Sequence, residues 1–432
     1  MIEIFAIFLT LLSLTLFFNF PLNYFLLNNI SKIRFTHNES FLINIVLNAN
    51  ILLLLSFFQI NLNQVFFVFI FGSIFFFIKF FKEYLELINR NIFTILSFII
   101  IFYSISIVLL KKAFLEWDGL AHWLFKSTVY FQGGTYEDLV GLPFDYYPHL
   151  GTYIWAFFWK NSLLQVEYYG RLFYVFIFII AIFTLRHKLT KKFSEFNKDV
   201  IIFILILLSS NIFLFGGYQE YFLFVIFFTF SHFFLKFFYV KKVDFYFFPE
   251  IFLILTSLCI MWIKQEGFFY YIILNFIFLI HSQISYKKKL IYLFIVATLI
   301  ILFYTIKNHY FGVLRFNESL INEETYRNIE IQYLFEKILI ITKYFLISFF
   351  KYPIWIVILI SFFILSNKYL LFNKTKFVFT YIMLIFIFIF AIFLNTPDDI
   401  AWLAPLTLNR IVFATSGFLI FLIIDLLNKN AK

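Results

Sequence analysis

Two carboxylates and a histidine stand within seven residues of a chain that is otherwise mostly apolar: Glu116, Asp118 and His122. On a regular α-helix Asp118 and His122 share one face with Lys126, four residues further on. A carboxylate beside an imidazole can serve as a general base, which takes the proton from an attacking hydroxyl group. A metal site needs more ligands than Asp118 and His122 supply. The plainer interpretation is an interfacial helix whose two tryptophans lie among the lipid headgroups.

Three more charged residues lie at the predicted ends of apolar runs. Lys264 and Glu266 stand between two such runs with almost no loop, and Arg410 is at the start of the last run. A charge costs about 2.5 to 3.5 kcal/mol at the centre of a membrane helix and less near its ends. Snorkelling side chains in a tight turn explain Lys264 and Glu266 without a function. The functional hypothesis is that Lys264 and the forked guanidinium of Arg410 bind a phosphate.

Two other candidates have structural explanations. Glu167 and Arg171 are spaced i, i+4, which is the spacing of a helix ion pair, at the mouth of an apolar run. His149 follows a proline and precedes a short apolar stretch that ends near Trp159. This stretch predicts a re-entrant or surface-lying helix, in which His149 more often makes a hydrogen bond at an interface than binds a ligand.

The composition indicates a membrane protein. Of the 432 residues, 63% are hydrophobic and 13% are charged, whereas soluble domains are about 25% charged. The single cysteine, Cys259, excludes an intramolecular disulfide and a cysteine metal cluster. The chain has no P-loop, GxGxxG, HExxH or GxSxG motif, which argues against a nucleotide-driven pump and a soluble-type hydrolase.

The apolar runs predict an all-α integral membrane protein with about thirteen transmembrane helices. We place these spans at 4–27, 41–59, 65–81, 92–110, 169–185, 200–215, 221–239, 250–263, 267–281, 290–306, 352–366, 377–394 and 406–427. Three parts follow from them: an N-terminal three-span extension (1–90), a catalytic membrane module (91–285) with an outer loop at 111–168 that carries interfacial helices, and C-terminal spans (286–432) with an outer loop at 307–351.

The basic residues predict the orientation. If the first connection faces the cytoplasm, the cytoplasmic segments hold 21 of the 34 lysines and arginines, as the positive-inside rule requires. The candidate residues then share the outer face of the cytoplasmic (inner) membrane, towards the periplasm or exterior, where no nucleotide donor is available. The charge of +10 is explained by these segments and does not indicate nucleic acid.

The order of these segments resembles the polytopic GT-C glycosyltransferases, especially the protein O-mannosyltransferase and aminoarabinose transferase group and its uncharacterised bacterial relatives. The likeness consists of EWDGLAHWLFK at the head of an outer loop, YYPHLGTYIWAFFW, the step from Glu167 to Arg171, the Lys264–Gln265–Glu266–Gly267 turn, and Arg410 beginning a late span. It covers roughly residues 92–285 and the last span. The loop has Glu-x-Asp where the family has Asp-x-Asp or Asp-Glu, so a divalent metal stays open as a cofactor.

The resemblance implies an inverting transfer of a sugar from a polyprenyl-phosphate donor to an acceptor hydroxyl on a glycan, lipid or protein. It implies Asp118 as general base with Glu116 beside it, and Lys264, Arg410 and Arg171 at the donor phosphate. His122, Glu266 and His149 would support them. Two alternatives stay open: a polysaccharide polymerase or ligase that acts on lipid-linked glycans, and a polytopic transporter or flippase.

Overall fold

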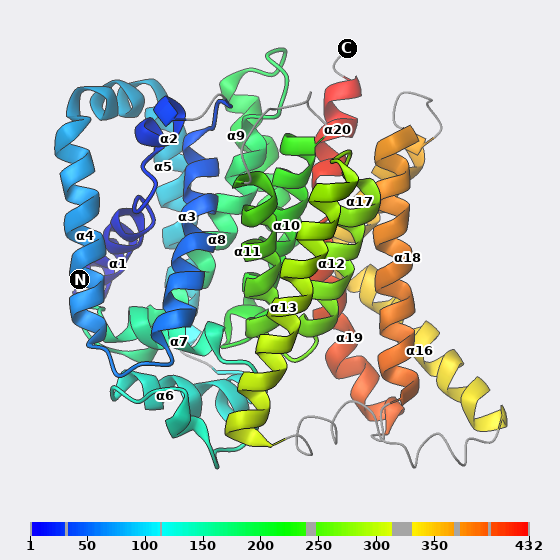
Figure 1. Ribbon diagram of the computed structural model, residues 1–432. Coiled ribbons are helices and arrows are strands. Elements are labelled where there is room, and N and C mark those ends of the chain that lie inside the picture. Colours follow the sequence, from blue (N-terminus) through cyan, green and yellow to red (C-terminus); the bar gives the residue numbers. More distant parts are fainter. Residues whose placement is uncertain are drawn as a thin grey trace. The chain divides into compact units, whose positions relative to one another are not determined.

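The computed structural model describes residues 2–30, 33–112, 115–238, 248–312, 331–366, 372–395 and 399–430, and within these ranges every regular element is a helix (Figure 1). The chain forms two compact units, and each is described by itself. Unit 1 comprises Met1–Pro143 and Pro148–Val225, and unit 2 comprises Phe144–Tyr147 and Ile226–Asn430. The three-part division expected from the sequence stays a prediction.

The elements of unit 1 are α1 (Ile2–Phe17), α2 (Tyr24–Ile30), α3 (His37–Leu55), α4 (Leu62–Lys79), α5 (Phe81–Lys112), the π-helix η1 (Gly119–Leu124), α6 (Phe125–Phe131), the 3₁₀ turn η2 (Glu137–Leu139), α7 (Leu150–Lys160), α8 (Glu167–Arg186), α9 (Glu195–Ser209) and the 3₁₀ turn η3 (Ile212–Phe215). Helix α10 (Glu220–Phe238) begins in unit 1 and continues in unit 2. Unit 2 contains α11 (Phe248–Ile263), α12 (Gly267–His281), α13 (Tyr286–Phe311), α16 (Ile331–Lys351), α17 (Pro353–Ser366), α18 (Phe372–Asn395), α19 (Ile400–Ser416) and α20 (Phe421–Asn430).

Seven described helices are long and apolar enough to cross a membrane, or up to nine if two bent pairs each form one span. The predicted count of thirteen is therefore not confirmed. The difference lies mainly in short helices: α1, α9, α11 and α12 have 15 or 16 residues. At 1.5 Å per residue such a helix is about 24 Å long or less, short of the roughly 30 Å hydrocarbon core. The predicted runs 4–27 and 200–215 each include a turn beside the short helix, whereas the runs 250–263 and 267–281 are no longer than α11 and α12.

The predicted span 4–27 shows why a run of apolar residues need not be one helix. Its helix ends at Phe17, and the chain then turns through Pro21 before α2. The backbone groups that this break releases are bonded by side chains of α3: the amide of Asn44 donates to Phe18 O at 2.8 Å, and that of Asn48 donates to Phe20 O at 2.9 Å. A break within a membrane requires such partners, because lipid offers none.

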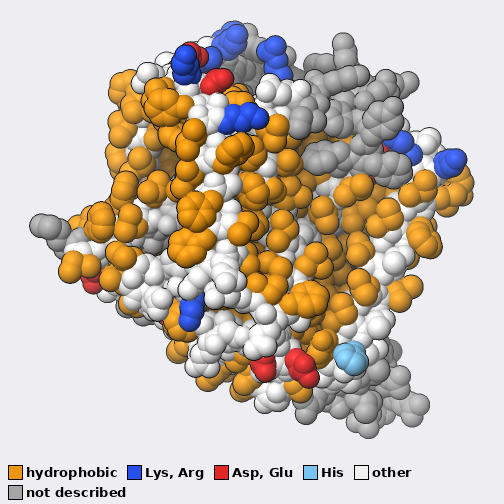
Figure 2. Space-filling view, turned by 60° about the vertical axis from the view of Figure 1, so that its left-hand side comes forward, with side chains coloured by type: hydrophobic (Ala, Val, Ile, Leu, Met, Phe, Trp, Pro, Cys, Tyr) orange, Lys and Arg blue, Asp and Glu red, His pale blue; other side chains and the backbone are white. Residues whose placement is uncertain are grey.

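The outer surface of unit 1 has the character expected of a lipid-facing surface. Along α4 one side of the helix is exposed and carries only apolar side chains at Phe67, Val68, Phe71, Phe75 and Ile78. Figure 2 shows a belt of hydrophobic side chains across the middle of the face that it draws, with most of the lysines and arginines along the upper edge. A broad apolar belt bounded by charges is typical of a membrane protein.

The expected outer loop at 307–351 is largely helical where it is described. Helix α13 continues to Phe311, and α16 begins at Ile331 and ends at Lys351. The chain bends by 94° between α16 and α17, at Tyr352 and Pro353. Together the two helices are long and apolar enough to form one broken span or a re-entrant loop. The charged residues of α16 recur among apolar ones with a helical period, so no long uncharged run marks this helix in the sequence.

Candidate functional site

The segment that begins at Glu116, at the head of the first predicted outer loop, is held against a turn at Gly216 and Gly217, about a hundred residues later in the chain. The backbone N–H of Glu116 donates to the carbonyl of Gly216 at 2.8 Å. A Cβ on Gly119 would lie 2.5 Å from that same carbonyl oxygen, and one on Gly217 would lie 2.9 Å from Gly119 Cα. Gly217 has φ of +95°, which favours glycine. Two backbones can approach this closely only because both sides lack side chains.

Both carboxylates, Glu116 and Asp118, are half-buried beside this turn. The chain that follows is η1, a π-helix rather than the regular α-helix that we expected. Because a π-helix bonds residue i to i+5, the i, i+4 face that the sequence predicted for Asp118, His122 and Lys126 is altered. His122 and Lys126 are buried, and the His122 ring lies edge-to-face on Trp117 at 5.1 Å. Single π-turns of this kind occur frequently at functional sites.

Arg171 holds the other side of the same turn. Its Nε and Nη2 donate to the two carboxylate oxygens of Glu167 at 2.7 and 3.1 Å, and its Nη1 donates to Phe215 O at 3.0 Å. The Arg171 side chain is 1% exposed and that of Glu167 is 19% exposed. The i, i+4 ion pair expected from the sequence is therefore present. All three guanidinium nitrogens donate to protein oxygens, which supports a role for Arg171 in positioning the turn. Phosphate binding by Arg171 stays a prediction.

Folding thus brings Glu116 and Asp118 close to Arg171 through residues 215–217, although about fifty residues separate them in the sequence. Phe215 accepts the hydrogen bond from Arg171, and the next residue accepts the one from Glu116. The dipeptide Gly216–Gly217 signals a turn in the sequence, but nothing in the sequence indicates which segments contact it.

A buried polar group beneath this turn was missed by sequence reasoning. The Tyr174 hydroxyl donates to Gln219 Oε1 at 2.9 Å, and Gln219 is fully buried. A Cβ on Gly151 would lie within 2 Å of that same oxygen, so α7 depends on a glycine here. The next residue, Glu220, is a buried acid at the start of α10. The available signal was two polar residues placed directly before a long apolar run.

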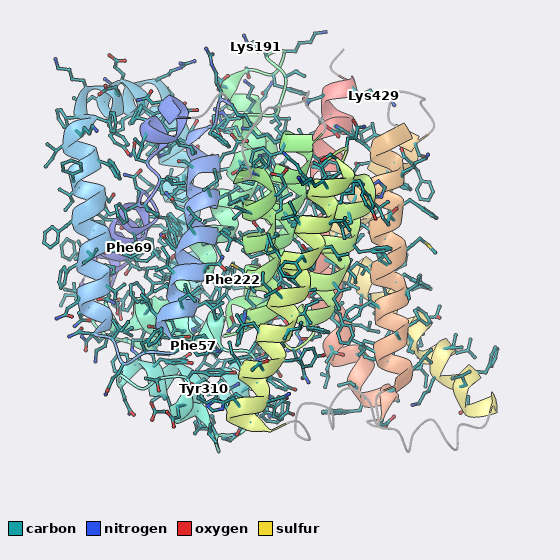
Figure 3. The ribbon with its side chains drawn as sticks, viewed as in Figure 1. Phe57, Phe69, Lys191, Phe222, Tyr310 and Lys429 are labelled. Carbon is teal, nitrogen blue, oxygen red and sulfur yellow. The ribbon has the colours of Figure 1, made fainter. Side chains whose placement is uncertain are left out.

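His149 connects the end of α3 to the residues that precede α7. Its Nε2 lies 2.7 Å from Ser56 Oγ, and its ring packs on Tyr136 at 4.2 Å and on Phe57 at 5.5 Å. Phe57 is at the lower end of unit 1, while Lys191 is at its upper end (Figure 3). The surroundings are those of a hydrogen-bonded interface histidine, which was the plainer interpretation. A supporting role in chemistry stays a prediction.

Helix α7 is enclosed by protein rather than lying on a surface. Residues Leu150 to Phe158 are all buried, and the helix packs against α3, α4, α6 and α8. The Trp155 indole N–H donates to Glu167 O at 3.3 Å, and a Cβ on Gly170 would lie 2.5 Å from Trp155 O. The contact ties α7 to the helix that carries Arg171, so the two segments hold each other in place.

In unit 2, Lys264 and Glu266 form the tight turn that the sequence predicts between α11 and α12. The Gly267 N–H donates to Lys264 O at 3.0 Å, and a Cβ on Gly267 would lie 1.9 Å from Ile260 O. The Lys264 ammonium lies 3.4 Å from Glu266 Oε1, with the lysine side chain 8% exposed. A nearly buried ammonium beside a partly exposed carboxylate fits an anion-binding role and also fits a local ion pair.

Arg410 does not begin a span, as the sequence suggested. Helix α19 begins at Ile400 after the cap residue Asp399, so Arg410 lies ten residues, or about 15 Å, into it. The helix then bends by 50° into α20. The predicted span began after Pro405, where a proline usually interrupts a helix, but α19 continues through this residue. An arginine this far into a membrane helix suggests a function, because such charges are costly in lipid.

Lys264 precedes α12 and Arg410 lies on α19, and these two helices share a neighbour within unit 2. Helix α12 packs on α18, where Phe269 and Tyr270 contact Phe388 at 5.3 and 5.0 Å. Helix α19 also packs on α18, as well as on α16, where Ser348 donates to Asn409 Oδ1 at 2.9 Å. The fold therefore reduces a separation of 146 residues to one intervening helix. Binding of one phosphate by both residues stays a prediction.

Among the described residues, no group of three or more His, Cys, Asp or Glu side chains is placed to hold a metal ion. No family model, curated protein or solved structure matches the chain. The assignment of a function therefore depends on the residues and their geometry.

Proposed function

We propose that this chain is a membrane glycosyltransferase, of the type that the GT-C resemblance implies, which uses a polyprenyl-phosphate sugar as donor. Asp118 takes the proton from an acceptor hydroxyl group, and the oxygen forms a bond to the anomeric carbon with inversion. The bond from that carbon to the phosphate oxygen breaks, and polyprenyl phosphate leaves with the electron pair. Lys264 and Arg410 are the residues that we propose to bind the phosphate.

One observation carries this proposal: two half-buried carboxylates lie directly before a π-turn, in a segment that backbone contacts fix in place. The Glu116 N–H, the Gly119–Gly217 approach and the Arg171–Phe215 bond all converge on one turn. A general base must be held within hydrogen-bond reach of the proton that it takes. A carboxylate on an anchored segment is therefore a better candidate for the base than one on a segment without such contacts. An interfacial helix that only anchors tryptophans has no need of this arrangement.

Purified protein in proteoliposomes, supplied with polyprenyl-phosphate sugars and acceptor-containing membrane extract, tests the proposal. Replacing Asp118 by Asn keeps the shape of the side chain and removes the base, so we expect donor consumption to fall about 10²- to 10⁴-fold. The matched control is Asp138→Asn in the same loop, which should retain activity. The pKa of Asp138 is lowered because the backbone N–H and hydroxyl of Thr135 donate to it, so its role in the turn is already explained.

The phosphate-binding residues have a separate test. Replacing Lys264 or Arg410 by Gln should weaken donor binding, and the double replacement should cost less than the sum if both bind one phosphate. Arg410→Lys should still reduce binding, because it loses the forked geometry. Additive losses that appear in stability rather than in donor affinity would assign each residue to its own helix end.

A transporter or flippase is a second candidate, and the position of Arg410 favours it. A charge ten residues into α19, and the buried His232 within α10, resemble the intramembrane polar residues of transport pathways. The same proteoliposomes separate the two functions. Movement of a lipid-linked sugar across the bilayer without loss of donor indicates transport, whereas release of polyprenyl phosphate indicates transfer.

A further inference from the structure

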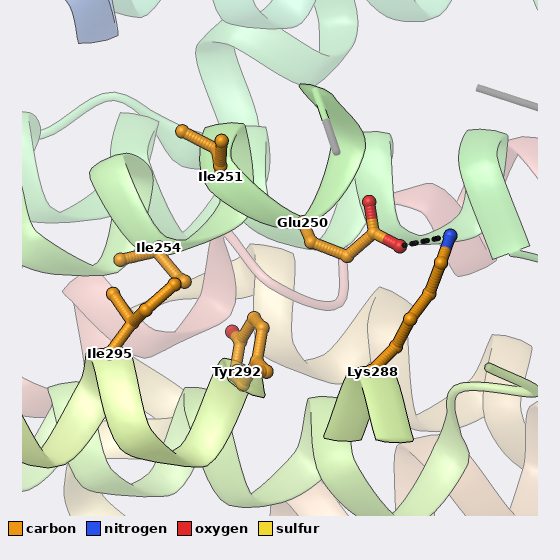
Figure 4. A pocket seen from close by; sticks show the side chains of 6 residues that line it. All are labelled: Glu250, Ile251, Ile254, Lys288, Tyr292 and Ile295. Atoms are coloured by element: carbon orange, nitrogen blue, oxygen red, sulfur yellow. Dashed lines mark ion pairs between the residues drawn. The ribbon is translucent and has the colours of Figure 1, made fainter. Parts of the chain in front are cut away.

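A carboxylate in unit 2 that has no part in the proposed sugar transfer lies at the edge of a small hollow. Glu250 is at the start of α11 and is 6% exposed. With Lys288 and Tyr292 of α13 it lines a hollow whose other walls are Ile251, Ile254 and Ile295 (Figure 4). The hollow therefore has one acidic residue, one basic residue and apolar walls.

The two oxygens of this carboxylate differ. Oε1 of Glu250 lies 3.5 Å from the Lys288 ammonium, a long ion pair, and the Lys288 side chain is 42% exposed. Oε2 is closed off from solvent and accepts no hydrogen bond from any described residue. A buried charged acceptor without a donor costs free energy. A ligand that carries N–H donors would supply what this oxygen lacks.

The neighbouring hydroxyl does not supply the donor. Tyr292 donates its hydroxyl hydrogen to Asn275 Oδ1, and the amide of Asn275 in turn donates to Ser257 Oγ and Tyr271 O. This network is complete within α11, α12 and α13. Tyr292 is therefore a fixed wall of the hollow.

The surroundings indicate a lipid. Ile251 is exposed on one side of the hollow. On α13, the apolar residues Leu290 and Phe294 are also exposed, within two helical turns of Lys288. The basic run Lys287–Lys289 begins the same helix. The hollow therefore opens at the end of an apolar helix surface next to lysines, which is where a phospholipid headgroup meets its acyl chains.

We propose that this hollow binds a phospholipid whose headgroup ends in a primary ammonium group, of the ethanolamine type. The ammonium donates to Glu250, the phosphate is held by Lys288, and the first methylenes of the acyl chains lie against the isoleucines. A trimethylated headgroup has no N–H to donate, and an anionic glycerol headgroup offers hydroxyl donors but no positive charge to the carboxylate. The site is independent of the proposed sugar transfer.

Native mass spectrometry of the full-length protein with defined lipids tests this proposal. We expect phosphatidylethanolamine to bind at least about tenfold more tightly than phosphatidylcholine or phosphatidylglycerol, because of the three it alone brings an ammonium with N–H donors to the carboxylate. Glu250→Gln should abolish that preference, and Glu250→Asp, which shortens the side chain and keeps its charge, should reduce it. Glu86→Gln, at an exposed site on α5, is the matched control and should leave it unchanged.

Three results would overturn the proposal. Equal binding of the three phospholipids would mean that the lysines bind any phosphate. An unchanged preference in Glu250→Gln would mean that the carboxylate is not the acceptor. Binding of soluble phosphoethanolamine as tight as that of the whole lipid would mean that the apolar walls take no part. The Asp variant keeps the test valid if the Gln variant does not fold.

Discussion

Breaking the ion pair between Glu167 and Arg171 should destabilise unit 1 by several kcal/mol. Arg171 is 1% exposed and donates to both oxygens of Glu167. Glu167→Gln leaves its guanidinium buried with the Phe215 carbonyl and a neutral amide, and a buried charge that loses its partner typically costs about 3 to 5 kcal/mol. At about 1.4 kcal/mol per factor of ten, the unfolding equilibrium should shift by two to three and a half orders of magnitude.

The reverse change should cost less. Arg171→Met leaves Glu167, whose side chain is 19% exposed and keeps some hydration. The double variant carries no uncompensated charge, so it should be more stable than the sum of the single losses predicts, by at least about 1 kcal/mol. Titration with SDS in mixed micelles, followed by far-UV circular dichroism, measures each free energy of unfolding.

A matched control is available in the other unit. Lys374 and Asp425 form an ion pair at 3.1 Å, with side chains 31% and 27% exposed. Asp425→Asn should therefore cost less than about 1 kcal/mol, as more exposed pairs do. A loss below 1 kcal/mol for Glu167→Gln as well, or full additivity in the double variant, would refute the claim that this pair holds the turn.

Three further predictions test the surroundings of the site. Gly217→Ala should disrupt the docking of the loop head and lower both stability and activity. Gly133→Ala is the control: its φ of +98° is similar but no atom lies within 4 Å of the added Cβ, so it should cost only the backbone strain. Thermal unfolding of the two variants measures the difference. In a background without Cys259, a cysteine at Glu137 should react with an impermeant thiol reagent from outside the cell and one at Lys191 should not, and equal labelling would reject the predicted orientation. The carboxyl ¹³C signal of Asp138 should titrate with a pKa below the ordinary value of about 3.9. The stabilisation of the turn by this carboxylate is therefore fully present above that pH and is lost as the pH falls through the lowered pKa. Titration at the ordinary pKa would reject the hydrogen bonds from Thr135.

Local features of the site followed from spacing in the sequence. The pair at 167 and 171 and the turn at 264–267 are both present as predicted, because each is fixed by residues four or fewer apart. The helical character of the chain also followed, since its apolar runs permit little else in lipid.

Features set by distant contacts did not follow. The π-turn at Gly119–Leu124 lies where the loop head meets Gly216 and Gly217, nearly a hundred residues later, and a single sequence does not show that pairing. The burial of α7 results from α3, α4, α6 and α8 closing around a stretch that looked interfacial. The start of α19 was missed because Pro405 normally marks a helix end, whereas this helix continues through it.

The central claim is that Asp118 is the base for sugar transfer, and mass spectrometry of cell-surface glycans and glycoproteins tests it most directly. Cells that lack the gene should lose one sugar modification, and the wild-type gene or the Asp138→Asn variant should restore it. The Asp118→Asn variant, present in the membrane at the same level, should not restore it. Restoration by Asp118→Asn, or an unchanged set of surface glycans in cells without the gene, would contradict the account.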